Sequence, residues 1–73
     1  MDYQKYISIN PNIRFGKPCI TGTRISVADV LGWLSNGMTY EEIIDDFPQI
    51  TKEQILACLA FSASKERTIR VAA

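Results

Sequence analysis

The 73-residue sequence contains no histidine, two cysteines and no long hydrophobic run. Without histidine, a serine or cysteine nucleophile lacks its usual base, and two cysteines are too few ligands for a zinc site. We therefore expect no enzyme activity, no catalytic residues, no metal and no cofactor. The longest apolar run, Ile55–Phe61, has seven residues. A transmembrane helix needs about 20, so we expect no membrane partner.

The N-terminus also lacks the apolar stretch of a signal peptide, and two cysteines do not form a disulfide framework. These absences favour a cytoplasmic location, with Cys19 and Cys58 as small buried hydrophobes. A single domain of this size rarely gains more than about 3–5 kcal/mol from its core. We therefore expect a homodimer, because self-association would add stability.

The net charge of zero conceals an uneven distribution. Residues 1–24 hold four basic residues and one acidic residue, whereas residues 25–51 hold five acidic residues and no basic one. Residues 52–73 are again basic, with four basic and two acidic residues. A polyanion such as DNA would have to approach the two ends, although ordinary solvated charge explains the same pattern.

One motif recurs three times and predicts three helix starts. In each copy a hydroxyl residue is followed three positions later by Asp, Glu or Gln, which is the pattern of a capping box. An apolar residue before the cap and another at the fourth helical position complete a hydrophobic staple. The three pairs are Ser26 with Asp29, Thr39 with Glu42, and Thr51 with Gln54.

These starts predict helices over residues 27–36, 40–47, and 52 to 65 or beyond. Gly37 suits the left-handed position after the first helix, and Pro48 stops the second. Gly32 lies inside the first helix, where we expect it to admit a neighbouring backbone. In the third helix the spacing predicts a core-facing stripe of Ile55, Leu56, Leu59, Ala60 and Ala63.

The segment before the helices predicts a β-hairpin. Residues 6–9 and 13–15 alternate in polarity, with turn residues 10–12 between them, while residues 16–18 form a second turn and residues 19–25 look extended. The connection between the second and third helices is short enough for a helix-turn-helix corner. The fold prediction is thus mainly α, a three-helix, homeodomain-like helix-turn-helix core over residues 26–66. A β-ribbon (1–25) precedes it and a tail (67–73), expected to be disordered when free, follows it.

Two groups of residues are candidates for binding. The first could contact DNA: Thr51, Lys52 and Gln54 at the start of the third helix would reach bases, and Arg14 and Lys17 would contact phosphates. Capping by Thr51 and Gln54, and solvation of the basic side chains, are the alternatives. The second group is a partner or dimer interface comprising Phe61, Ala57, Cys58, Ile7 and Ile9. Phe61 lies opposite the predicted core stripe, so we expect it to pack under the ribbon, against a second copy or against another protein, with an ordinary exposed aromatic residue as the remaining alternative.

The region from Ile9 to Leu59 resembles a known family. The specific part is Gly16-Lys17-Pro18 followed by Gly22-Thr23-Arg24, accompanied by Asp46-Phe47-Pro48. This pattern is similar to the bacterial domain-of-unknown-function family 433, many of whose members are described as antitoxins. The resemblance implies a homeodomain-like core after a short β region, and an antitoxin of a toxin–antitoxin system that binds a PIN-like ribonuclease toxin and represses its own operator DNA.

The resemblance also gives structural meaning to several residues. Gly16 and Gly22 would supply turns with positive φ. Arg24 would bond carbonyl groups and fix the ribbon to the core, a role that we favour over phosphate contact. With Gly37 and Pro48 these form the predicted structural set. The leading hypothesis is an antitoxin and DNA-binding autorepressor, and its rival is a dimeric protein-interaction module that does not bind DNA.

Overall fold

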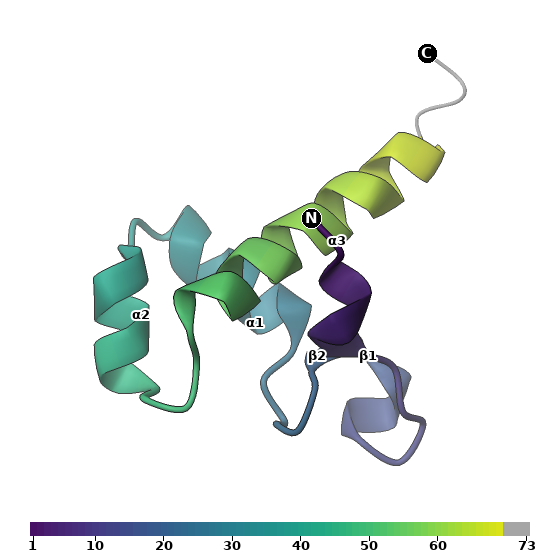
Figure 1. The fold of residues 1–73 in the computed structure, drawn as a ribbon, viewed down its shortest axis with the longest axis horizontal. Helices are drawn as coiled ribbons and strands as arrows, with labels where there is room; N and C mark the ends of the chain where they lie inside the picture. Colours follow the sequence, from purple (N-terminus) through teal and green to yellow (C-terminus); the bar gives the residue numbers. More distant parts are fainter. Residues whose placement is uncertain (70–73) are drawn as a thin grey trace.

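A short N-terminal ribbon packs against three helices in the computed structural model (Figure 1), which describes the backbone of residues 1–69 and the side chains of residues 1–66. Helix α3 crosses α1, and α2 lies beside the start of α3. The predicted mainly α fold with a preceding hairpin is confirmed. The elements in order are η1 (Tyr3–Lys5), β1 (Ile7–Ser8), η2 (Arg14–Gly16), β2 (Cys19–Ile20), α1 (Val27–Ser35), α2 (Tyr40–Asp46) and α3 (Lys52–Ile69).

All three predicted capping boxes are formed. At α1, the Asp29 N–H donates to Ser26 Oγ at 2.9 Å and the Ser26 N–H donates to the Asp29 carboxylate at 3.0 Å. The boxes of α2 and α3 repeat this reciprocal pairing with Thr39–Glu42 and Thr51–Gln54. Each box satisfies backbone donors that a helix start leaves unpaired, so the predicted starts are correct.

The helix ends also follow the sequence signals. Gly37, with φ of +92°, takes the left-handed position after α1. Helix α2 ends at Asp46, and Phe47 has left the helical region (φ −131°, ψ 78°) before Pro48. The short connection to Lys52 turns the chain sharply, so α2 and α3 form the expected corner. Helix α3 continues to Ile69, into the predicted tail. The expected disorder of residues 70–73 lies outside the described residues.

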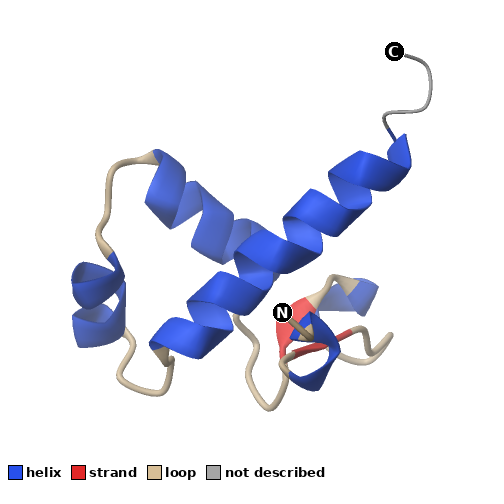
Figure 2. Ribbon diagram, turned by 45° about the horizontal axis from the view of Figure 1, so that its top comes forward, coloured by secondary structure: helices blue, strands red, loops and turns tan. Residues whose placement is uncertain are grey.

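The hairpin pairs differently from the prediction. Strand β1 pairs antiparallel with β2, with Ile7 opposite Ile20, and these strands (red in Figure 2) lie far from α2. Residues 13–15 form no strand, because Arg14 (φ 52°) and Phe15 (φ 59°) adopt the left-handed conformation and Gly16 follows at φ 82°. Three successive left-handed residues cannot lie in an extended ladder, so the chain turns there and reaches β1 only at Cys19.

The core joins the ribbon to all three helices. Its fully buried large side chains come from β2, α1, α2, the α2–α3 connection and α3, namely Ile20, Val30, Ile43, Ile50 and Ile55. Around them pack partly buried aromatic residues, including Trp33 and Phe47, whose rings stack with centroids 4.4 Å apart. Both cysteines are free and buried, as predicted.

The predicted core face of α3 is wrong. Ile55 is buried, but Leu59 is 36% exposed and Ala63 is exposed, whereas Ala57 and Cys58 are fully buried. Helix α3 packs against η1 and β1 as well as α1, and its small Ala57 and Cys58 side chains are buried in that packing. Because apolar residues occur all round this helix, periodicity alone does not select the buried side.

Gly32 also differs from its prediction. A Cβ atom built on this residue would have no heavy atom within 4 Å, other than its chain neighbours and its own helix backbone, so no other backbone approaches it closely. Gly16 and Gly22, by contrast, have the expected positive φ values of +82° and +83°. None of the helices in the described part of the chain combines the length and apolar character needed to cross a lipid bilayer.

Candidate interaction surface

Arg14 fastens the loop of residues 10–17 to the start of α1. Its guanidinium donates to the Arg24 carbonyl oxygen at 2.7 Å and to the Asp29 carboxylate at 3.1 Å. Partial burial raises the pKa of Asp29, but the hydrogen bonds from Ser26 and Arg14 outweigh this effect and leave the pKa below its usual 3.8. Arg14, predicted to contact phosphate, is therefore engaged within the protein.

The anchoring role predicted for Arg24 belongs to Arg14 instead. Among the described residues no hydrogen bond or ion pair involves the exposed Arg24 side chain, and only its carbonyl takes part in the anchor. Lys17, the other predicted phosphate contact, is also exposed. These two cations lie on the ribbon, on either side of β2 in the sequence.

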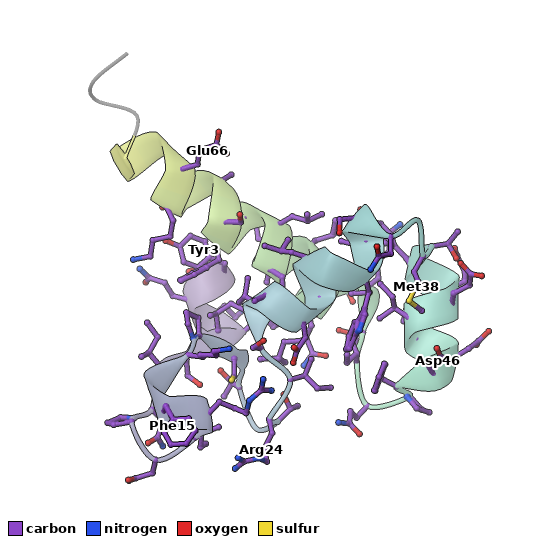
Figure 3. All side chains as sticks on the ribbon, turned by 180° about the vertical axis from the view of Figure 1, so that it is seen from behind. Tyr3, Phe15, Arg24, Met38, Asp46 and Glu66 are labelled. Atoms are coloured by element: carbon purple, nitrogen blue, oxygen red, sulfur yellow. The ribbon has the colours of Figure 1, made fainter. Side chains whose placement is uncertain are left out.

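The same loop presents Phe15 to solvent. Its side chain is 102% exposed, and its backbone is left-handed at φ 59°. Figure 3 places Phe15 and Arg24 at one end of the molecule, away from Asp46 on α2. Ile9, a predicted interface residue at the start of this loop, is 59% exposed. We call Phe15 and Ile9, with the exposed cations Lys17 and Arg24 of the same ribbon, the ribbon tip.

Phe15 was missed as a functional candidate because the alternation around it favoured a strand. A signal was nevertheless present in the sequence. Turn residues at 10–12 and 16–18 leave only three residues between them. A strand that short between two turns gains few ladder bonds, so a tight loop with an exposed tip was the better interpretation.

The other predicted interface residues are divided by burial. Ala57 and Cys58 are fully buried and Ile7 is 8% exposed, so these three contact the protein's own core. Burial in this apolar environment raises the pKa of the Cys58 thiol to about 11. Phe61 packs edge-to-face against Tyr3 of η1, with ring centroids 5.5 Å apart, so it lies under the ribbon, one of the placements the sequence allowed.

The predicted DNA-contacting residues lie on the first turn of α3. Thr51 and Lys52 are exposed, and Gln54 is half-buried. Thr51 and Gln54 are joined to each other in the capping box, and the Lys52 ammonium lies 5.8 Å from the Tyr40 ring centre. Close to this turn, α2 exposes four carboxylates and no basic residue, namely Glu41, Glu42, Asp45 and Asp46.

Two apolar surfaces remain on the helices. One is a hollow of about 220 Å³ between α1 and α3, lined by Val27, Leu31 and Phe61 among others, with Lys65 also in its lining. The second is the outer stripe of α3, which we define as Leu56, Leu59, Ala60 and Ala63. Within the described residues, no group of three His, Cys, Asp or Glu side chains could hold a metal ion.

Comparison with models of known protein families assigns this chain to a family. The model of a family described as "Protein of unknown function (DUF433)" matches residues 7–62, which include the ribbon, all of α1 and α2, and most of α3. The chain belongs to the DUF433 family. Among curated proteins, none matches the sequence.

A solved DUF433 protein supports the same assignment. The crystal structure of a member from Anabaena variabilis ATCC 29413 is similar to this chain, with a TM-score of 0.81 and 26% sequence identity. The match covers 90% of this chain and 65% of that one, so the chain spans less than two thirds of its solved relative. The ribbon and three helices of this DUF433 domain are therefore an architecture found in another member.

Proposed function

We propose that this DUF433 domain is an antitoxin that acts by binding another protein, a PIN-like ribonuclease toxin, through its ribbon tip. The resemblance stated above supports an antitoxin. The observation that carries the proposal is Phe15, an aromatic side chain that is completely exposed on a left-handed backbone. Aromatic side chains that enter a partner's pocket commonly supply a large part of the binding energy of protein interfaces.

The backbone of the ribbon tip supports a binding role. Each non-glycine residue in the left-handed region costs roughly 1–3 kcal/mol, and such strain tends to occur at functional sites. Here Arg14 and Phe15 both adopt it, and the two bonds of the Arg14 guanidinium hold the loop in place. A loop fixed in this way loses little conformational entropy on binding.

The charge around Phe15 indicates the partner's chemistry. Lys17 and Arg24 are exposed on the same ribbon as Phe15, and Ile9 adds exposed apolar area. A complementary surface would offer an apolar pocket for the ring with carboxylates at its edge. The proposed toxin site therefore combines these two features.

The test uses the product of the neighbouring gene and a variant of Phe15. Expression of that product alone should stop growth, and co-expression of this protein should restore it. Because Phe15 contacts no core residue, Phe15→Ala should keep the fold but weaken toxin binding by about 30-fold, as expected for a hot-spot residue. Glu41→Gln, an exposed change on α2, should bind like the wild type.

Two results would contradict this proposal. One is normal growth when the neighbouring gene product is expressed alone. The other is an unchanged dissociation constant for Phe15→Ala, measured by calorimetry with a variant whose circular dichroism matches the wild type. The first would remove the antitoxin role, and the second would move the binding site away from the ribbon tip.

Operator binding is the second candidate function. The observation in its favour is the α2–α3 corner, with Thr51 and Lys52 exposed at the start of α3, where a recognition helix contacts base edges. The four carboxylates of α2 oppose it, because the helix before a recognition helix crosses the phosphate backbone. The outer stripe opposes it too, because Leu59 and Ala63 are exposed in the middle of α3, where a helix that reads bases needs polar side chains.

Gel-shift titration against the protein's own upstream region tests this second function. A salt-dependent shift that disappears in the double variant Lys52→Ala, Gln54→Ala would support autorepression through α3. Because Gln54 also caps α3, circular dichroism must show that the variant is folded. No shift at micromolar protein would exclude operator binding and leave the rival hypothesis, a protein-interaction module without DNA.

A further inference from the structure

Helix α3 carries a second apolar seam that the fold covers only in part, since Leu59 and Ala63 are exposed and Leu56 and Ala60 are half-buried. Leu56, Leu59 and Ala63 follow one another at spacings of three and four residues, and Ala60 lies beside them. This spacing is typical of a helix that packs along another helix. None of the four belongs to the hydrophobic cluster of the core or to the partly buried residues packed against it.

The surroundings of α3 explain which part of the seam is free. Helix α1, η1 and β1 pack on the side of α3 that carries Cys58 and Phe61. The Tyr3 hydroxyl donates to Ser64 Oγ at 3.2 Å, so η1 lies beside the second half of α3. At about 100° per residue, Leu56, Leu59 and Ala63 are centred on the opposite side of the helix. At the edge of the seam, Ala60 and Ala63 line a shallow hollow that they share with Met1 and Tyr3. The C-terminal turns of α3 also extend beyond the other elements (Figures 1 and 2).

Opposite charges stand at the two ends of the seam. Lys52 lies seven residues before Leu59 and Glu66 lies seven residues after it, so all three occupy one line along the helix. Both charged side chains are exposed, and the only ion pair among the described side chains joins Arg14 to Asp29. The Lys52 ammonium has only a weak contact, at 5.8 Å, with the Tyr40 ring centre.

This arrangement is complementary to itself in one orientation. Within one helix, Lys52 and Glu66 are separated by about 21 Å at 1.5 Å per residue. When two α3 helices pack antiparallel with a two-fold axis near Leu59, each Lys52 meets the partner's Glu66. The Leu59 side chains meet at the axis, and the alanines let the helices approach closely. A parallel pair would instead oppose like charges at both ends.

We propose that the outer stripe of α3 is the interface of a homodimer in which two α3 helices pack antiparallel. The occupant is a second copy of this chain, because the seam has the charge complementarity that an identical antiparallel helix supplies. The pairing would bury Leu59, the exposed leucine, and would add stability to a domain whose own core is small. It uses no residue of the ribbon tip, so the two binding surfaces are separate.

Charge exchange is the sharpest test, with dimer dissociation measured by analytical ultracentrifugation of the purified protein. Lys52→Glu or Glu66→Lys alone should weaken the dimer about tenfold, because each change turns both end contacts into repulsion. The double variant should recover the wild-type dissociation constant, because the pairs are merely reversed. An equimolar mixture of the two single variants should form a heterodimer, since each protein then supplies the charge that the other lacks.

Cross-linking tests the position of the axis. Leu59→Cys should form an intermolecular disulfide under mild oxidation, whereas Lys65→Cys, exposed on another side of the same helix, should not. Cys19 and Cys58 are buried and do not compete. Leu59→Ser should yield a folded monomer, because this side chain lies outside the core.

Some outcomes would overturn the proposal. One is a wild-type protein that stays monomeric at about 100 µM, a concentration at which even weak dimers associate. Another is an equal dissociation constant for the single charge variants and the wild type. The third is cross-linking at position 65 in preference to position 59. A dimer that Phe15→Ala disrupts and Leu59→Ser leaves intact would place the interface at the ribbon tip. None of these results bears on whether the neighbouring gene product is toxic.

Discussion

At the scale of single residues, Arg14 shows how one side chain stabilises an otherwise unfavourable loop. Its backbone is left-handed at φ 52°, yet its guanidinium bonds both the Arg24 carbonyl and the Asp29 carboxylate. Charge-assisted hydrogen bonds of this kind are stronger than neutral ones, and they offset part of the conformational cost. The exposure of Phe15 thus depends on its neighbour.

Gly32 is a residue whose replacement should stabilise the protein. It lies inside α1, and a Cβ atom there would meet no heavy atom within 4 Å beyond its chain neighbours and its own helix backbone. Glycine costs about 1 kcal/mol relative to alanine inside a helix, so Gly32→Ala should raise the free energy of unfolding by about that amount. Thermal unfolding followed by Trp33 fluorescence should show a midpoint higher by about 4–8 °C.

Gly37→Ala is the matched control for that substitution. Gly37 has φ of +92° at the end of the same helix, so alanine there is strained and should lower the midpoint. A destabilised Gly32→Ala protein would show that something in solution does approach this residue closely.

At the scale of elements, the capping boxes define the helices independently of the packing around them. Each box joins residues only three apart, as in the bonds between Ser26 and Asp29. The ribbon, in contrast, depends on contacts that are distant in the sequence. Strand β1 pairs with residues 19–20 across a loop whose shape depends on the ion pair of Arg14 and Asp29. Local hydrogen bonds can therefore be predicted from the sequence, whereas long-range strand pairing cannot.

The α1 cap should give stability a dependence on acid pH. The folded-state pKa of Asp29 lies below the usual 3.8, so its ionisation stabilises the protein fully above that value, and the contribution is lost as the pH falls through the lower folded pKa. Asp29→Asn should therefore lower the free energy of unfolding by about 0.5–1 kcal/mol at pH 7. The difference from the wild type should shrink as the pH falls below 3.8.

Urea denaturation at a series of pH values measures this dependence. Glu41→Gln is the control, since Glu41 lies in the first turn of α2, is exposed and forms no ion pair among the described side chains. At pH 7, Glu41→Gln should lower the free energy of unfolding by less than Asp29→Asn does. An Asp29→Asn deficit that persists unchanged at pH 2 would mean that the carboxylate charge contributes nothing.

At the scale of the whole molecule, the placement of α3 decides which surfaces are available. The ribbon and helix α1 cover one side of this helix, which buries Cys58 and half-buries Phe61. On the other side, Leu59 and Ala63 of the outer stripe stay exposed. The ribbon tip lies at a separate place, with Phe15 far from α2 (Figure 3). The ribbon tip and the outer stripe are thus separate surfaces, for which we propose a toxin and a second copy of the chain as the respective partners.

The two thiols should report on unfolding of the whole molecule. Cys19 is 3% exposed and Cys58 is fully buried, and burial raises the Cys58 pKa to about 11, so thiolate is scarce in the native protein at pH 8. With an unfolding free energy of about 4 kcal/mol, labelling by a thiol reagent should be slower than in urea by about a thousandfold. Ile43→Ala, which opens a cavity in the core, should label rapidly.

The labelling kinetics are read by mass spectrometry of the intact protein. Rapid modification of native protein at one cysteine would show that the ribbon opens without global unfolding. Modification of both cysteines at the same rate would show that ribbon and helices unfold together.

The sequence alone determined the three helices and their caps, because each capping box joins residues three positions apart. It also determined the left-handed glycines and the α2–α3 corner, because single residues impose these turns on the backbone. Pro48 and Gly37, for instance, act through their own backbone preferences. The tertiary structure decided which strand pairs with β1, that Arg14 rather than Arg24 anchors the loop, and which side of α3 is buried. Helix α3 is apolar on opposite sides, so only the ribbon that packs against it, through contacts distant in the chain, selects one of them.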